Sequence, residues 1–154
     1  MPRGGDPFNE FDMKIDLFQK SDINDTAQHQ VTALFAQLES GKEPVPLSEL
    51  YEAGNPFTMA CCKDGQTIVG IALMCHYRVL SGAKGWIEDV VVDETMRGKG
   101  IGKKLVEKLL EVAREKQLSE VLLFSADHRQ AAIKLYTQLG FKRKHSGLYL
   151  LRNP

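Results

Sequence analysis

Glycines and basic side chains alternate in the segment 97–104, which has the sequence RGKGIGKK. The residues without a side chain, where a ligand could come close to the backbone, are Gly98, Gly100 and Gly102. Local positive charge comes from Arg97, Lys99, Lys103 and Lys104. Apolar periodicity predicts that a helix begins here, at Lys99 or Gly100, and the first amides of a helix have no partner within it. These amides and the positive end of the helix dipole favour an anion such as a diphosphate.

The spacing in this segment excludes two common phosphate-binding loops. A P-loop would need glycine at position 97 and serine or threonine at position 104, where the chain has Arg97 and Lys104. A dinucleotide-binding GxGxxG loop would need glycine at position 103 or 105, where the chain has Lys103 and Leu105. A glycine-rich helix start that merely packs tightly is the remaining alternative to an anion site.

Hydrophobic periodicity and turn residues predict the elements that must position this segment. Strands are predicted over residues 14–18, 57–62, 67–79, 86–92 and 121–124, followed by a terminal hairpin over 141–144 and 148–152. Helices are predicted over residues 25–38 and 47–51, from Lys99 or Gly100 onward, and over 129–139. This order predicts a three-layer α+β domain, in which a mixed, mostly antiparallel sheet of about seven strands is flanked by about four helices.

The domain is expected to span residues 13–154, because residues 1–12 are rich in glycine, proline and charge and are typical of a flexible tail. One domain also agrees with the length of 154 residues. The terminal hairpin would offer a strand edge through which two copies could pair as a homodimer.

Composition and charge exclude several functional classes. Twenty basic side chains balance twenty acidic ones, so no overall field attracts the chain to nucleic acid. No apolar stretch approaches the roughly 18 residues that a membrane-spanning helix needs. The three cysteines, Cys61, Cys62 and Cys75, lack the spacing of metal ligands. We therefore expect free thiols, no metal, no membrane and a cytoplasmic location.

Two motifs in the sequence resemble signatures of the GNAT superfamily of N-acetyltransferases. The first signature, Arg/Gln-x-x-Gly-x-Gly/Ala after a strand, corresponds to RGKGIG at residues 97–102. The second, Ala-x-x-x-Tyr-x-x-x-Gly-Phe, corresponds to AIKLYTQLGF at residues 132–141. The order of the predicted elements along residues 13–152 is also similar to that of the family.

The resemblance implies a GNAT-type acyl-CoA N-acyltransferase fold. It also implies transfer of an acetyl group from the cosubstrate acetyl-CoA to a primary amine by direct attack in a ternary complex. The alternative is a regulatory or sensor module of the same fold that binds CoA without turnover. The strand at residues 87–92, IEDVVV, is also similar to that of glucosamine-phosphate N-acetyltransferases. The acceptor would be a small-molecule or peptide amine, which the loops 41–56 and 79–85 would contact.

The same resemblance implies roles for individual residues. The backbone of Val90, Val91 and Val92 would pair with the pantetheine arm like an added strand. The residues that would bind the pyrophosphate are Arg97, Gly98, Lys99, Gly100, Ile101, Gly102 and Lys103. Tyr136 would protonate the departing CoA thiolate, although its spacing is equally expected of an aromatic residue that only packs. Many members have asparagine where this chain has Arg129, which could instead reach a CoA phosphate or face water.

The reaction also needs a base, because a protonated amine cannot attack. Glu88 and Asp89 precede the valines, and in a regular strand they point to opposite faces, so at most one faces the substrate. Glu88 shares a face with Trp86, and a carboxyl beside an indole can have a raised pKa that suits a base. The alternative for Glu88 is a solvated or salt-bridged acid. His128 could be a base but is more typical of a helix N-cap neighbour, and His76 is expected in the core or at an edge.

Overall fold

The computed structural model describes residues 13–154, so the predicted flexible tail, residues 1–12, lies outside the described residues. The chain divides into two compact units, Met1–Phe124 and Ser125–Pro154, and we describe each by itself. A single domain over residues 13–154 therefore stays a prediction.

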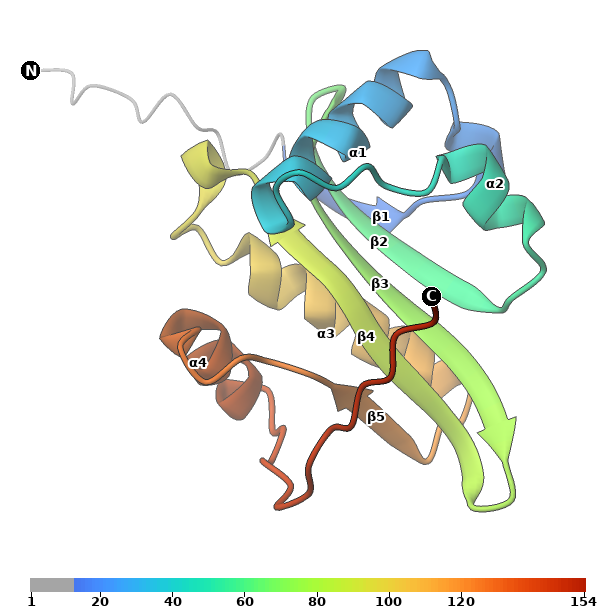
Figure 1. The fold of residues 1–154 in the computed structure, drawn as a ribbon. Helices are drawn as coiled ribbons and strands as arrows, with labels where there is room; N and C mark the ends of the chain where they lie inside the picture. The colour runs from blue at the N-terminus through green and yellow to red at the C-terminus, as the bar shows by residue number, and fades with distance from the viewer. Residues whose placement is uncertain (1–12) are drawn as a thin grey trace, which may run out of the picture. The chain divides into compact units, whose positions relative to one another are not determined.

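The first unit is built on one five-stranded sheet. Its strands are β1 (Met13–Leu17), β2 (Phe57–Asp64), β3 (Thr67–Val79), β4 (Gly82–Val92) and β5 (Glu120–Leu123). They lie in sequence order, with antiparallel pairing from β1 to β4 and parallel pairing between β4 and β5 (Figure 1). The mixed, mostly antiparallel sheet is thus confirmed, but it has five strands and not the predicted seven.

Tight turns join the antiparallel strands β2, β3 and β4. Asp64 pairs with Thr67 and Val79 pairs with Gly82, which leaves two residues in each turn. Gly65 has a φ of 60°, a left-handed conformation that glycine adopts without strain. Because β5 runs parallel to β4, the chain must cross back along the sheet, and it does so through the helix α3 (Ile101–Glu115).

Helices cover both faces of this sheet. The helices α1 (Asp25–Leu38) and α2 (Leu47–Glu52) lie on one face, and α3 lies on the other (Figure 1). The side-chain oxygen of Asn24 caps α1 by accepting a hydrogen bond of 2.8 Å from the amide of Ala27. The predicted helices of this unit are confirmed, and α1 has the predicted bounds.

The α1 face of the sheet forms a hydrophobic core, in which the buried residues include Ala27, Val31, Leu34, Cys61, Ile71 and Val91. On the other face, α3 turns one apolar stripe inward, made of Ile101, Leu105, Val106, Leu109, Val112 and Ala113. This stripe has the spacing of about 3.6 residues that the sequence indicates. The two cores fix both helices on the sheet.

The beginning of α3 packs against β3 at Gly70, where no room is left for a side chain. A Cβ atom at Gly70 would lie 3.0 Å from Cδ1 of Leu105 and 3.2 Å from Cγ2 of Ile101. Both of these side chains are buried. The missing side chain of Gly70 therefore determines how near the beginning of α3 lies to the sheet.

The second unit contains the helix α4 (Gln130–Gln138) and no strand, so the predicted terminal hairpin over 141–144 and 148–152 is wrong. Apolar residues suit a strand, but a strand also needs a backbone partner, and these segments form no ladder with each other. Leu148, Tyr149, Leu150 and Leu151 are instead 61%, 95%, 72% and 88% exposed. The argument for a homodimer through a hairpin edge loses its basis, and the homodimer stays a prediction.

We predict that Gly70→Ala lowers the free energy of unfolding by about 1–3 kcal/mol, because the added methyl group overpacks the contact with α3. Urea denaturation followed by circular dichroism measures the change. Gly147→Ala is the control, since a Cβ atom there would lie no closer than 3.8 Å to a neighbour. An equal midpoint for Gly70→Ala and the natural chain would show that α3 does not depend on this close approach.

Candidate active site

The strand β4 contains a bulge just before its valines. Ile71 of β3 pairs with Val91 and Leu73 pairs with Glu88, so β4 has one residue more than β3 between these pairs. Asp89 lies within the bulge and has a φ of 52°, which is uncommon for a residue with a side chain. The bulge interrupts the regular alternation of side chains between the two faces of the sheet. Glu88 and Asp89 are neighbours in the chain, but this alone no longer implies that they point to opposite faces.

Beyond the bulge, β4 has a free edge. Its parallel pairing with β5 ends where Ile87 meets Leu123, while β4 itself continues to Val92. In the described sheet, no strand pairs with this edge of β4 from Glu88 onward. Val91 is buried against α1, and the valines on either side of it are half-buried. The side chains thus anchor the strand while backbone groups on one edge have no partner in the sheet.

Asp93 organises the turn that follows β4. Its amide donates a hydrogen bond of 2.8 Å to the carbonyl of Val69, which extends the pairing with β3. Its carboxylate accepts hydrogen bonds from the amide of Thr95 at 2.9 Å and from the Thr95 hydroxyl at 2.6 Å. These bonds lower the pKa of Asp93, as does a further side-chain bond from Gln37. Arg97 closes the turn, because its Nε donates to the carbonyl of Val92 at 3.1 Å.

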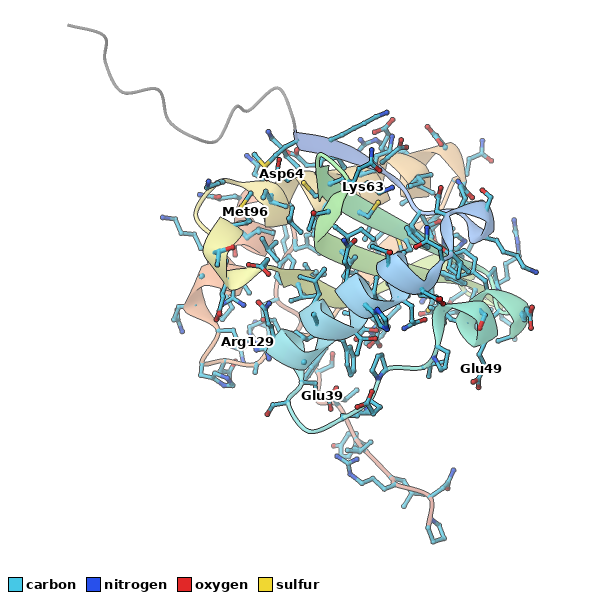
Figure 2. All side chains as sticks on the ribbon, turned by 90° about the horizontal axis from the view of Figure 1, so that it is seen from above. Glu39, Glu49, Lys63, Asp64, Met96 and Arg129 are labelled. Carbon is cyan, nitrogen blue, oxygen red and sulfur yellow. The ribbon has the colours of Figure 1, made fainter. Side chains whose placement is uncertain are left out.

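Asp93 has no predicted role, although an aspartate two residues before a threonine at a strand end is a signal for such a turn. Met96, labelled in Figure 2, lies in the same turn and is buried. The turn is therefore held by a polar network at one end and by an apolar anchor at the other.

The glycine-rich segment leads directly into α3. Gly98 and Gly100 have φ values of 79° and 77°, and Gly100 is the N-cap of the helix. A Cβ atom at either position would meet nothing within 4 Å. These two glycines are therefore required by the backbone conformation and not by tight packing, which was the alternative to an anion site.

The beginning of α3 has the features of an anion site. Its first turn contains no acidic residue, whereas Lys103 and Lys104 are exposed there. Ile101 is buried in the apolar stripe of α3, so its side chain packs in the core and does not face a ligand. The first amides of the helix have no acceptor within it, and they add to the positive end of the dipole. This arrangement can bind a diphosphate.

Acidic side chains surround the bulge. Partial burial, and then the charge of Asp89, raises the pKa of Glu88, although both residues are exposed to solvent. Burial and the charge of Glu39 raise the pKa of Asp89, while Lys42 lowers it. Glu39, labelled in Figure 2, is the C-cap of α1 and forms an ion pair of 3.6 Å with Lys42. Lys42 belongs to the predicted acceptor loop 41–56, so this loop acts electrostatically on Asp89.

The second unit carries Tyr136, on α4. Its ring packs edge-on against Phe141, with 5.8 Å between ring centroids, and its carbonyl accepts a hydrogen bond of 3.0 Å from the Phe141 amide. Burial raises the pKa of the half-buried Tyr136 and Arg129 lowers it, so the phenol keeps its proton at neutral pH. Arg129, labelled in Figure 2, is the N-cap of α4. Tyr136 thus packs against Phe141 and also carries a protonated phenol, the form that a general acid needs.

The histidines fit structural roles. His76 Nε2 lies 2.8 Å from the hydroxyl of the buried Thr58, and burial together with the charge of Lys116 lowers its pKa. His76 is half-buried on β3, an inner strand of the sheet, so its predicted place in the core or at an edge is not confirmed. The exposed His128 directly precedes the N-cap Arg129, which confirms it as an N-cap neighbour.

Within residues 13–154, no group of three or more His, Cys, Asp or Glu side chains could hold a metal ion. No helix in this part of the chain is long and apolar enough to cross a membrane. The cysteines are free thiols, and burial raises the pKa of Cys61 to about 11. At neutral pH this thiol is protonated and is a poor nucleophile.

Comparisons with known proteins agree with this geometry. The sequence model of the Acetyltransferase (GNAT) family matches residues 23–141. Glucosamine 6-phosphate N-acetyltransferase of Trypanosoma brucei brucei is 28% identical over 135 residues, which cover 85% of this chain and 90% of that protein. Bovine thialysine N-epsilon-acetyltransferase is 36% identical over 78 residues, 50% of this chain and 46% of that protein.

Solved structures show the same fold. A Trypanosoma brucei acetyltransferase superposes with a TM-score of 0.73 at 25% identity, over 92% of this chain and 100% of that one. Glucosamine-6-phosphate N-acetyltransferase of Arabidopsis thaliana has a TM-score of 0.73 at 22% identity, over 92% and 99% of the two chains. Because the family match includes β4, the glycine-rich segment and Tyr136, the chain belongs to the acetyltransferase (GNAT) family and is an N-acetyltransferase enzyme.

Proposed function

We propose that the protein transfers the acetyl group of acetyl-CoA to a primary amine by direct attack in a ternary complex. The amine nitrogen forms a bond to the acetyl carbon, the carbon–sulfur bond breaks, and the CoA thiolate receives a proton. The observation that carries this proposal is the continuity of the free edge of β4, the Asp93 turn and the left-handed glycines before α3. An extended arm with a diphosphate at one end fits such a series of backbone groups.

The proposed contacts with acetyl-CoA follow the order of these segments along the chain. The backbone of Val90, Val91 and Val92 binds the pantetheine arm at the free edge of β4. The residues proposed to bind the pyrophosphate are Arg97, Gly98, Lys99, Gly100, Ile101, Gly102 and Lys103. Exposed lysines and a helix start without acidic residues support this part of the proposal.

Two side chains carry the proton transfers. Glu88 accepts a proton from the attacking amine, directly or through water, and its raised pKa supports this role. Tyr136 donates a proton to the departing thiolate, and its raised pKa supports a protonated phenol before the reaction. Asp89 is the alternative base, since it adjoins Glu88 at the bulge.

The acceptor is proposed to be a small-molecule amine. The two relatives above are named for transfer to glucosamine 6-phosphate and to thialysine, and both of these acceptors are small molecules. A formal net charge of zero gives no reason to expect a nucleic-acid partner. Free thiols support the proposed cytoplasmic location.

We predict that acetyl-CoA and CoA, but not ATP, raise the melting temperature of the protein. A ligand at about a hundredfold its dissociation constant adds about 2.7 kcal/mol of stability, which differential scanning fluorimetry detects readily. Release of thiol in the presence of a panel of amines then separates an enzyme from a module that only binds CoA. The absence of a shift with both CoA species would contradict the proposal.

Tyr136→Phe is expected to lower kcat about 100-fold, because the phenylalanine ring keeps the packing but cannot donate a proton. Steady-state thiol release measures kcat, and calorimetry should show CoA affinity within about twofold of the natural chain. Tyr149→Phe is the matched control, since Tyr149 is 95% exposed, and its kcat should not change. Equal kcat values for the two variants would remove Tyr136 from the mechanism.

The pH dependence identifies the base. Because burial and Asp89 raise the pKa of Glu88, kcat/KM should rise with pH through a pKa above the ordinary glutamate value of 4.5. Glu88→Gln should abolish this limb and lower kcat/KM about 100-fold. Asp89→Asn should keep the limb but shift it to lower pH, since it removes a neighbouring negative charge. If the rise of kcat/KM with pH disappears in Asp89→Asn but not in Glu88→Gln, the general base is Asp89 and not Glu88.

A further inference from the structure

The turn between β4 and α3 is joined to another layer of the fold by one side chain of α1. Nε2 of Gln37 donates a hydrogen bond of 3.2 Å to Oδ2 of Asp93. Its Oε1 accepts a hydrogen bond of 2.9 Å from the amide of Glu94. Gln37 lies in the last turn of α1 and is exposed, so burial of its side chain does not explain its position. Both ends of its amide are used by consecutive residues of the turn.

The other hydrogen bonds of this turn come from the turn itself or from the sheet. Thr95 donates twice to Asp93, and the amide of Met96 donates to the Asp93 carbonyl at 2.9 Å. Val69 of β3 accepts from the Asp93 amide. These bonds fix the shape of the turn and its attachment to β3. Gln37 connects the turn to α1 as well, and this connection restricts how the turn can tilt relative to the sheet.

We propose that Gln37 is a positioning residue for the cosubstrate and acts through Asp93 and Glu94 without touching the ligand. The inference rests on the acetyl transfer proposed above. The turn separates Val92, at the end of the proposed pantetheine strand, from Arg97, at the start of the proposed pyrophosphate loop. Both parts of the ligand are held largely by backbone groups, so affinity depends on the orientation of these two backbones relative to each other.

The expected effect is on binding and not on the chemical step. A turn that spends part of its time in other orientations lowers the apparent affinity by the fraction of molecules that are competent to bind. Once the cosubstrate is bound, its own contacts hold the turn in place. The reacting carbonyl, the base and the acid are then unchanged, so kcat at saturating acetyl-CoA should be preserved.

Gln37→Met tests this inference, since methionine has a similar length and helix propensity but makes neither hydrogen bond. The Kd of CoA, from calorimetry, and the KM of acetyl-CoA should rise about three- to tenfold, as expected for the loss of one or two ordinary hydrogen bonds. The kcat should stay within about twofold of the natural value. A fall in kcat at unchanged KM would overturn the inference.

Gln28→Met is a matched control from the same helix. Oε1 of Gln28 accepts a hydrogen bond of 2.8 Å from the amide of Leu47, and its Nε2 donates to the hydroxyl of Thr32 at 3.1 Å. The control therefore removes the same kinds of bond at the start of α2, away from the β4–α3 turn. The Kd of CoA should stay at the natural value in this variant, even where its stability falls as much as that of Gln37→Met.

A double-mutant cycle with Asp93→Ala tests the route of the effect. If Gln37 acts through Asp93 and Glu94, the two changes in the free energy of CoA binding should be less than additive. Full additivity, natural affinity in Gln37→Met, or an equal loss in Gln28→Met would each overturn the inference while the proposed function stands. Failure of the natural chain to bind CoA would overturn both.

Discussion

The proposed site depends on the unequal lengths of two paired strands. β4 continues to Val92, but its pairing with β5 ends at Ile87. From Glu88 onward, the amides and carbonyls on that edge of β4 have no strand partner in the described sheet. Backbone groups need a hydrogen-bonding partner, whether from protein, water or a ligand. A ligand arm that carries its own amides can supply one, so the mismatch between the strands creates the place where such an arm would pair.

The beginning of α3 must then stand at a defined distance from that edge, and two unrelated features fix it. Gly70 lets Ile101 and Leu105 approach the sheet closely, which sets the depth of the helix. The left-handed φ values of Gly98 and Gly100 set the direction from which the chain enters the helix. A side chain at Gly70 would collide with its neighbours. A side chain at Gly100 would have room, but it would strain the left-handed backbone conformation. The same residue type thus serves packing at one position and conformation at the other.

Most of the first unit could be predicted from the sequence because its elements carry local signals. The bounds of α1 follow from apolar spacing and the cap at Asn24, and the loop before α3 follows from glycines whose conformation is a local requirement. The terminal strands were predicted wrongly because apolar residues show that a segment suits a strand but not that a partner lies beside it. The bulge at Asp89 depends on pairing with β3, and the role of Gln37 depends on a contact across 56 residues, so neither has a local signal.

The bulge also couples the proposed base to the acceptor. Glu88 and Asp89 are consecutive, and burial, followed by the charge of Asp89, raises the pKa of Glu88. The pKa of Asp89 in turn responds to Glu39, the C-cap of α1, and to Lys42, on the loop 41–56 where the acceptor is expected. A cationic amine that enters this region stabilises the deprotonated carboxylates by its own charge. Binding of the protonated substrate would therefore help to prepare the base that must remove its proton, which a neutral acceptor could not do.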